Sequence, residues 1–287
     1  MGSFNGHALP GTFFIGFSIW WTINQLNRYY KCRRQNQVFR STPTYPFSCG
    51  RLKFPLFEPI LKLCLVLTGS IGEIYEGYSF SDEKFIATGN IQHLTMYLSV
   101  GINCVVDILV YYKTPMPRDI DYAVLILLLG VEGLEFNFHL HGRHDLDIHV
   151  HTLLIYAVIM NIIGVILEMK YRHSLLAALT RSYCFFVQGT WFYQIGFTLY
   201  NPFSKGINWK KDETLHITMV TVYFVIHCQV IFLIMIGINS AVVCYHRCRS
   251  NRNKMDDNTF RMLLQTNVNT GESTPILIGE SDDDNCL

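Results

Sequence analysis

The chain has 287 residues, of which half are apolar, 14% are aromatic and only 16% are charged, and its mean hydropathy is +0.22. Its formal net charge at pH 7 is only +1. This balance is typical of a polytopic membrane protein rather than a soluble domain. The sequence also contains no nucleotide-binding loop, no Ser-His-Asp order and no basic patch suited to nucleic acid.

Seven mainly apolar stretches follow one another along the chain. Each has about 20 residues, the length that an α-helix needs to cross ~30 Å of hydrocarbon. The stretches lie at residues 11–30, 55–76, 92–112, 120–140, 149–169, 182–201 and 216–245. We expect the first to be retained rather than cleaved as a signal peptide, because residues 1–10 contain no Lys or Arg. The sixth is the weakest, because Arg181, Gln188 and Gln194 interrupt its apolar character.

The polarity of the remaining segments predicts the organisation and the orientation of the chain. We expect an all-α membrane domain of seven transmembrane helices over residues 1–245 and a disordered cytosolic tail over residues 246–287, where the composition turns polar. Lys and Arg are concentrated after the first, third and fifth stretches and in the tail. Because such residues remain on the cytosolic side, we predict a lumenal or extracellular amino terminus and a cytosolic carboxyl terminus.

Cysteine and tryptophan residues fit this topology. The predicted lumenal segments contain no cysteine, so we expect no disulfide framework. Cys244 and Cys248 lie where the last stretch leaves the membrane, a position suited to palmitoylation, although two unmodified thiols fit equally well. The tryptophans are expected to serve as interfacial anchors and in helix packing; they are Trp20, Trp21, Trp191 and Trp209. Charged residues of the cytosolic half are expected to pair between helices; they are Lys62, Asp107 and Glu168.

Histidines are gathered on one side of the predicted topology. Imidazole titrates near neutrality and is the commonest metal ligand, so its concentration at the ends of apolar helices suggests a functional site. His227 lies deeper below the same face. Of the eleven histidines, those at the predicted lumenal face are His7, His93, His139, His141, His144, His149, His151 and His216.

Carboxylates accompany these histidines. On the fourth stretch, Glu132, Glu135 and His139 fall at i, i+3 and i+7, which is one stripe of a helix. Lipid penalises a charged group by roughly 2.5–3.5 kcal/mol, so we expect these side chains to line a polar vestibule within the bundle. For a zinc ion in this vestibule, the predicted ligands are His93, His139, His149 and His227. Residues expected to support them, or to replace them as ligands, are Glu73, Tyr97, His141, Asp147, His151, Gln188 and Tyr223.

Several functions are compatible with such a vestibule. A zinc-dependent hydrolase acting on a lipid or amide would use Glu132 or Glu135 as general base. A proton sensor or relay would exploit the titration of imidazole between about pH 5 and 7. Transport of protons or metal is a third hypothesis. Alternatively, each histidine caps a helix or forms a hydrogen bond with a neighbouring helix. The sequence indicates neither a substrate nor an oligomeric state.

The tail offers an explanation of a different class. Glu272 stands four positions before the pair Ile276 and Leu277, a spacing that matches an acidic dileucine sorting signal. Such a signal presents two aliphatic side chains to coat adaptors. The corresponding hypothesis is a non-enzymatic trafficking or adaptor protein of the membrane.

Five segments carry a resemblance to a known family. They are Gly-His-Ala-Leu-Pro-Gly-Thr-Phe-Phe (6–14), Gln-His-Leu-Thr-Met-Tyr (92–97), Glu-Gly-Leu-Glu-Phe-Asn-Phe-His-Leu-His-Gly-Arg (132–143), Asp-Ile-His-Val-His (147–151) and Gln-Gly-Thr-Trp-Phe-Tyr-Gln-Ile-Gly-Phe (188–197). Together they resemble the transmembrane protein 45 family, including its epididymal branch, over most of residues 1–245. The segment 76–90 is shorter than in that family and lacks its Pro-Gly-Pro-His stretch.

The resemblance implies a seven-span protein whose biochemical activity is not established. It also implies a place in Golgi, endosomal or lysosomal membranes, with the plasma membrane as an alternative. The histidines that match the family pattern are His93, His139, His141, His149, His151 and His227.

Overall fold

The fold is taken from a computed structural model of the chain. It describes residues 3–49, 52–79, 84–85, 88–138, 140, 142–203, 209 and 214–270. The predicted ligand His139 and its neighbour His141 lie outside the described residues, and so do Glu272, Ile276 and Leu277 of the predicted sorting signal.

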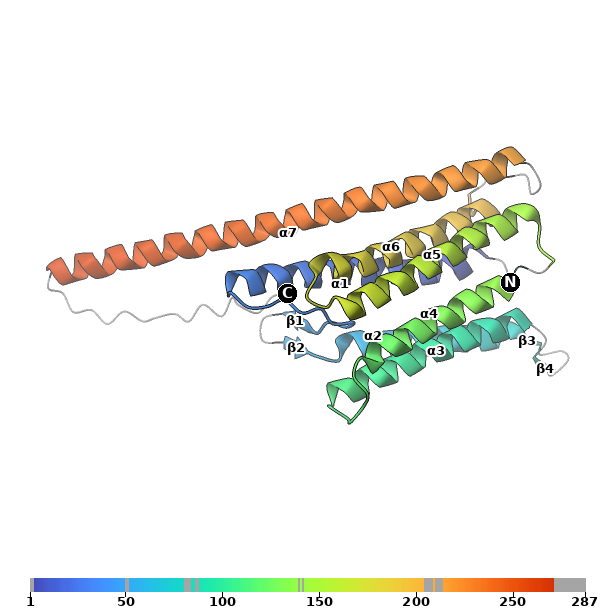
Figure 1. Cartoon of the computed structure of the whole chain (residues 1–287), viewed down its shortest axis with the longest axis horizontal. Coiled ribbons are helices and arrows are strands. Elements are labelled where there is room, and N and C mark those ends of the chain that lie inside the picture. Colours follow the sequence, from blue (N-terminus) through green and yellow to red (C-terminus); the bar gives the residue numbers. More distant parts are fainter. Residues whose placement is uncertain are drawn as a thin grey trace.

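The described chain forms a bundle of helices in which consecutive helices run in opposite directions (Figure 1). The helices are α1 (Phe4–Arg34), α2 (Phe57–Gly77), α3 (Thr88–Tyr111), α4 (Ile120–Phe138), α5 (Asp145–Lys170), α6 (Leu175–Leu199) and α7 (Thr214–Thr270). Two short antiparallel hairpins accompany them, formed by β1 (Phe47–Cys49) with β2 (Leu52–Phe54) and β3 (Tyr78–Ser79) with β4 (Lys84–Phe85). The predicted all-α class is confirmed, and each predicted apolar stretch coincides with a helix.

α6 lies at the centre of the bundle, between α1 and α5. Glycine permits its close approach to α1: a Cβ atom on Gly189 would lie only 2.8 Å from the backbone nitrogen of Ile15, and one on Gly11 would lie 2.8 Å from the carbonyl oxygen of Gly189. Trp191 of α6 is fully buried. The stretch that looked weakest by hydropathy is therefore the most enclosed helix, because its polar groups meet protein rather than lipid.

The outer helices carry large exposed apolar side chains, among them Leu127 on α4, Ile163 on α5 and Leu233 on α7. By length and composition, three helical segments in the described part of the chain can cross a membrane: Gly89–Tyr111, Asp145–Lys170 and Thr214–Arg252. Apolar side chains on the outside of a helical bundle contact the lipid bilayer. Seven spans and the orientation of the termini remain predictions.

α7 continues well beyond the predicted start of the tail. We predict disorder from residue 246, whereas the helix runs to Thr270 and has 57 residues (Figure 1). At 1.5 Å per residue it is ~86 Å long, far more than the ~30 Å of a hydrocarbon core. The sequence contains neither Gly nor Pro between Gly237 and Gly271, so nothing in this segment breaks the helix. The division into a membrane domain and a disordered tail stays a prediction.

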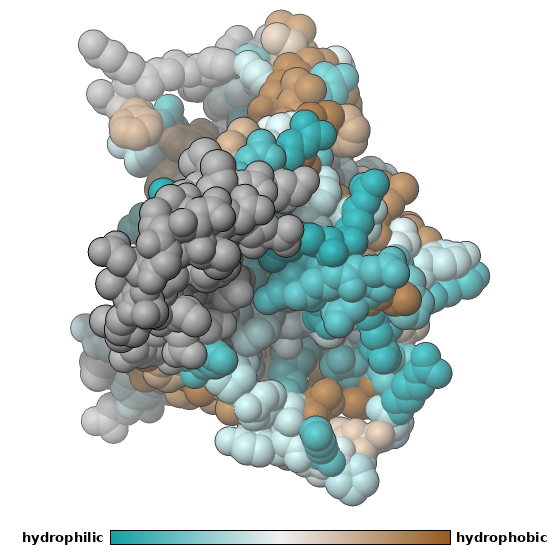
Figure 2. All heavy atoms as spheres, turned by 90° about the vertical axis from the view of Figure 1, so that its left-hand side faces the viewer, coloured by the Kyte–Doolittle hydropathy of each residue, from teal (hydrophilic) through white to brown (hydrophobic). Residues whose placement is uncertain are grey.

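The two ends of the bundle differ in chemistry. At the histidine end, defined by His7, His93, His149 and His151, helices α1, α3, α5 and α7 begin. At the basic end, defined by Arg28, Lys31, Arg34 and Arg249, α1 ends and α6 begins. Figure 2 looks onto the basic end, where hydrophilic side chains gather beside brown, apolar helix surfaces.

Candidate functional site

At the histidine end, α2 and α3 are joined by a histidine–carboxylate pair. Nδ1 of His93 lies 2.9 Å from Oε1 of Glu73, and Nδ2 of Asn90 donates to Oε2 of the same carboxylate at 2.6 Å. Glu73 ends one helix and His93 begins the next, so the short β3–β4 hairpin between them brings the two side chains together. Both side chains are partly exposed, at 18% for Glu73 and 32% for His93.

A second histidine–carboxylate pair lies in the first turns of α5. Nδ1 of His151 lies 2.9 Å from both the carbonyl oxygen and Oδ1 of Asp147, and Nη1 of Arg143 donates to Oδ2 of Asp147 at 2.8 Å. The spacing of four residues places His151 one turn above Asp147 on the same helix face. His151 is buried, so Asp147 connects a buried imidazole to a more exposed guanidinium.

His7 of α1 completes the group. Its ring centroid lies 5.8 Å from that of His151 and 5.3 Å from that of Tyr200, and its Nδ1 lies 3.1 Å from the carbonyl oxygen of Ser3. Burial lowers the pKa of His7 from 6.5 to about 4; the positive charges that His151 and His93 can carry lower it further, while the Ser3 carbonyl and the Asp147 carboxylate act in the opposite direction. The packed structure therefore favours the neutral form of this imidazole.

The amino-terminal turns of α1, residues 3–10, hold His7 against α6. The ring of Phe4 lies 4.9 Å from that of Phe197, and a Cβ atom on Gly196 would approach Phe4 to 3.2 Å. Pro10 follows within the helix, where it cannot donate the usual backbone hydrogen bond. Apolar contacts therefore hold the tip of α1 against α6, and the helix behind the tip lacks one backbone hydrogen bond.

The predicted metal ligands do not all lie in this group. Nε2 of His149 lies 2.7 Å from Oγ1 of Thr221, and the ring of His227 packs against Trp191 with centroids 5.6 Å apart. His149 and His151 point to different sides because residues two apart on a helix are separated by ~200°. Among the described residues, no three His, Cys, Asp or Glu side chains are placed to hold a metal ion. The zinc ion remains a prediction.

The two candidate catalytic carboxylates face different neighbours. Oε1 of the buried Glu132 accepts a hydrogen bond from Nε2 of Gln188 at 2.8 Å, and the side-chain oxygen Oε1 of Gln188 in turn accepts from Nδ2 of Asn161. This chain links α4, α6 and α5 deep in the bundle. Glu135 instead accepts from Oγ1 of Thr95 on α3 at 3.1 Å. A single catalytic site containing both carboxylates therefore finds no support in these contacts.

The two predicted supporting tyrosines have packing roles in the structure. The ring of Tyr97 lies against Gly69, where a Cβ atom would approach it to 2.6 Å. Tyr223 packs against Trp209 with ring centroids 5.9 Å apart. Cys244 and Cys248 are exposed on α7 near the basic end, and their modification remains a prediction.

A buried charge network occupies the half of the bundle toward the basic end. Arg181 of α6 pairs with Glu168 of α5, and the ring centroid of Trp21 lies 4.2 Å from the guanidinium of Arg181. Nε1 of Trp21 donates to Oε1 of Glu58 at 2.8 Å, while Nζ of Lys62 lies 2.6 Å from the same oxygen. We define the network as Trp21, Glu58, Lys62, Glu168 and Arg181.

One residue of the network had a predicted role, and another was not predicted. Trp21 takes the packing role expected of the tryptophans rather than the anchoring role, because it is only 3% exposed and links two ion pairs. Glu58 was not predicted as a functional residue, although its position four residues before Lys62 was a usable signal. The expected pairing between helices holds for Glu168, which pairs with Arg181. Lys62 pairs with Glu58 in its own helix and also interacts electrostatically with Asp107 of α3.

Apolar outer faces, buried polar contacts between helices and polar ends define a helical integral membrane protein. The family model described as "Family of unknown function (DUF716)" matches residues 118–240, which run from the start of α4 into α7. Transmembrane epididymal protein 1 of Rattus norvegicus is 24% identical, with 92% of each chain covered. The Homo sapiens protein of that name is 26% identical over 70% of this chain and 76% of its own length. Transmembrane epididymal protein 1A of Mus musculus is 24% identical over 87% of this chain and 84% of its own. The resemblance predicted from the sequence is confirmed.

Proposed function

We propose that the histidine end is a proton-responsive site, in which acidification releases the amino-terminal turns of α1 from the bundle. The observation that supports it is the position of His7, which is packed between His151 and Tyr200 on a segment with a proline behind it. A lumen that acidifies, as in the Golgi, endosomes and lysosomes, would supply the signal.

The response follows from unequal proton affinity in two states. In the packed state the pKa of His7 is about 4, whereas its ordinary value is 6.5. His7 therefore binds a proton more tightly in the released turns than in the packed turns. Because the proton prefers the released state, protonation shifts the equilibrium toward release. As the pH falls from neutral, the packed state loses free energy relative to the released state, and this loss is complete only below pH 4.

The groups that face His7 determine how sharp the response is. His151 and Asp147 face it from α5, His93 from α3 and Tyr200 from α6. The carboxylates of Glu73 and Asp147 lie against the imidazoles of His93 and His151, so a positive charge on either ring has a partner within the bundle. Their charge then repels a protonated His7 and favours release.

The full-length protein in lipid nanodiscs provides the test. Hydrogen–deuterium exchange of residues 4–10, corrected for the intrinsic pH dependence of amide exchange, should increase between pH 7 and pH 4.5. His7→Gln should remove this pH dependence because it retains a polar side chain but cannot be protonated. His149→Gln, which lies at the same end but contacts Thr221, is the matched control and should behave as the wild type. Equal pH dependence in wild type and His7→Gln would overturn the proposal.

Zinc binding is the second candidate, and one observation favours it. His93 and His151 each direct Nδ1 to a carboxylate, the arrangement in which Nε2 is the usual metal-coordinating atom and the carboxylate orients the ring. Elemental analysis of the purified protein tests it. Metal lost in His93→Ala/His151→Ala but kept in His149→Ala/His227→Ala would support zinc here and permit the hydrolase and transport hypotheses. A metal-free protein after zinc supplementation would reject all zinc-dependent functions.

A further inference from the structure

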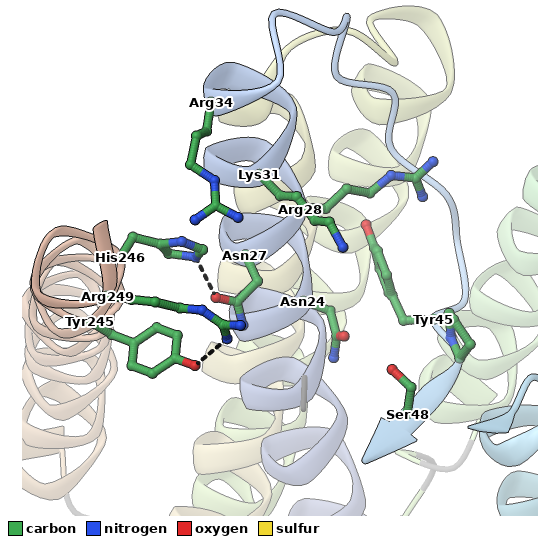
Figure 3. A pocket seen from close by; sticks show the side chains of 11 residues that line it. Asn24, Asn27, Arg28, Lys31, Arg34, Tyr45, Ser48, Tyr245, His246 and Arg249 are labelled. Carbon is green, nitrogen blue, oxygen red and sulfur yellow. Dashed lines mark hydrogen bonds between the residues drawn. The ribbon is translucent and has the colours of Figure 1, made fainter. Parts of the chain in front are cut away.

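A cavity of about 300 Å³ opens at the basic end between α1, α7 and the β1 strand (Figure 3). Arg28, Lys31 and Arg34 reach it from α1, and Arg249 reaches it from α7. The described residues that line the cavity include no carboxylate. Like charges three residues apart on a helix repel one another, and an anion in the cavity would relieve this repulsion.

Uncharged donors in the wall strengthen the case for an anion. Nε2 of His246 donates to Oδ1 of Asn27 at 2.9 Å, which leaves the Asn27 amide group to donate elsewhere. Nδ2 of Asn27 is buried and has no hydrogen-bond partner within the described chain. A buried donor without an acceptor is costly, and a ligand oxygen would satisfy it.

Contacts between α1 and α7 give the cavity a defined shape. Oη of Tyr30 donates to Oδ1 of Asn239 at 3.0 Å, and the ring of Tyr30 lies 5.8 Å from that of His246. Nη1 of Arg249 donates to Oη of Tyr245 at 3.3 Å, which orients the guanidinium beside Asn27 (Figure 3). The cations are therefore held on two helices that are attached to each other, rather than on mobile loops.

The place of the cavity indicates the source of the anion. It lies where the apolar part of α1 gives way to cations, which the distribution of Lys and Arg assigns to the cytosolic boundary of the membrane. Cytosolic leaflets carry anionic lipids, and basic pockets between helices at this depth bind their head groups. A volume of 300 Å³ accommodates a head group, while the acyl chains can follow the exposed apolar face of α7 at Leu233 and Ile236.

We propose that this cavity binds the phosphorylated head group of an anionic phospholipid of the cytosolic leaflet. Lys31 and Arg34 contact its phosphate oxygens together with Arg28, and the Asn27 amide donates to a further oxygen. The inference is independent of the histidine end, because the cavity lies at the opposite end of the bundle.

Thermal unfolding of the detergent-purified full chain, titrated with short-chain lipids, tests the proposal. Dioctanoyl phosphatidylinositol 4-phosphate should raise the unfolding temperature, whereas dioctanoyl phosphatidylcholine should not, since a ligand that binds only the folded state stabilises it. Arg34→Gln should weaken binding about fivefold, as expected for one cation near a lipid surface, and Lys31→Gln should act in the same direction.

Arg33→Gln is the matched control, because Arg33 is exposed, adjacent in sequence and absent from the cavity wall. It removes the same charge and should leave the affinity unchanged. Equal weakening by Arg33→Gln and Arg34→Gln would overturn the site, since only the overall charge would then matter. Equal stabilisation by the two lipids would overturn the selectivity for an anionic head group. Stabilisation by inorganic phosphate at the same concentration would overturn the lipid as the occupant.

Discussion

The histidine end and the buried charge network use similar ionisable groups in opposite ways. At the histidine end, His93 and Glu73 form a partly exposed pair, and Arg143 reaches Asp147 one turn along the chain. In the network, Arg181 and Glu168 are both fully buried and are linked through Trp21 to a further ion pair. Pairs that face solvent can exchange protons as the pH changes. Pairs enclosed on all sides cannot do so readily, and they hold α1, α2, α5 and α6 together instead.

The largest expected difference between the two regions comes from removing the arginine of one ion pair in each. Arg181→Leu leaves the Glu168 carboxylate buried without its cation, and we expect a loss of about 3–5 kcal/mol in the free energy of unfolding. Arg143→Leu breaks a more exposed pair and should cost about 1 kcal/mol or less. Denaturant titration in detergent measures both. Similar losses for the two variants would contradict the distinction between a buried network and a responsive end.

The close approach of α1 and α6 supports both regions, so disturbing it should have the next largest effect. Gly189→Ala places a Cβ atom 2.8 Å from the Ile15 backbone nitrogen, which side-chain rotation cannot relieve. We expect a cost of about 1–3 kcal/mol, typical of an overpacked core. Gly16→Ala is the matched control on α1, because nothing lies within 4 Å of its added Cβ. It should be neutral or slightly stabilising in the same unfolding measurement.

The pH dependence of stability should distinguish the two regions without disrupting either. Because the pKa of His7 is lowered to about 4 from 6.5, the unfolded chain binds the proton more readily. The stability that His7 contributes is present above pH 6.5 and is lost as the pH falls toward 4. Unfolding midpoints measured at pH 7, 5.5 and 4 should therefore fall less for His7→Gln than for the wild type. A parallel fall in both proteins would show that other groups control acid stability.

The smallest expected effect concerns the basic end. Arg34→Gln removes a side chain that lines the cavity at the basic end and makes no described ion pair, so the free energy of unfolding without lipid should change by no more than about 0.5 kcal/mol. The same variant should lose affinity for the anionic lipid. A large loss of stability without lipid would instead assign Arg34 to the cohesion of the fold, alongside Arg181.

Much of the fold could be predicted because helices that contact lipid have mainly apolar sequences. Apolar runs of about 20 residues located every helix, including α4 and α5 to within a few residues. The continuation of α7 beyond residue 245 could not be predicted in this way, since a polar helix has no apolar period and its continuation depends on helix propensity alone. The sequence left two roles open for Trp21, because a tryptophan has the same local signature whether it faces lipid or a buried guanidinium.

The sequence predicted one part of the candidate site and not another. The gathering of histidines at one end followed from helix direction, which a chain of antiparallel helices specifies almost completely. Which imidazoles meet did not follow, because that depends on the rotation of each helix about its axis. Rotation separates His149, which contacts Thr221, from His151, which contacts Asp147, although they are two residues apart.

The sequence by itself determined the helices, their order and the end of the bundle at which each ionisable group lies, because these depend on local composition and chain direction. The tertiary structure decided which groups touch. The glycines that let α6 approach α1, the burial that favours neutral His7 and the joining of Arg181 to Trp21 all arise from contacts between residues far apart in the chain. No local pattern encodes such contacts, because they depend on how whole helices pack.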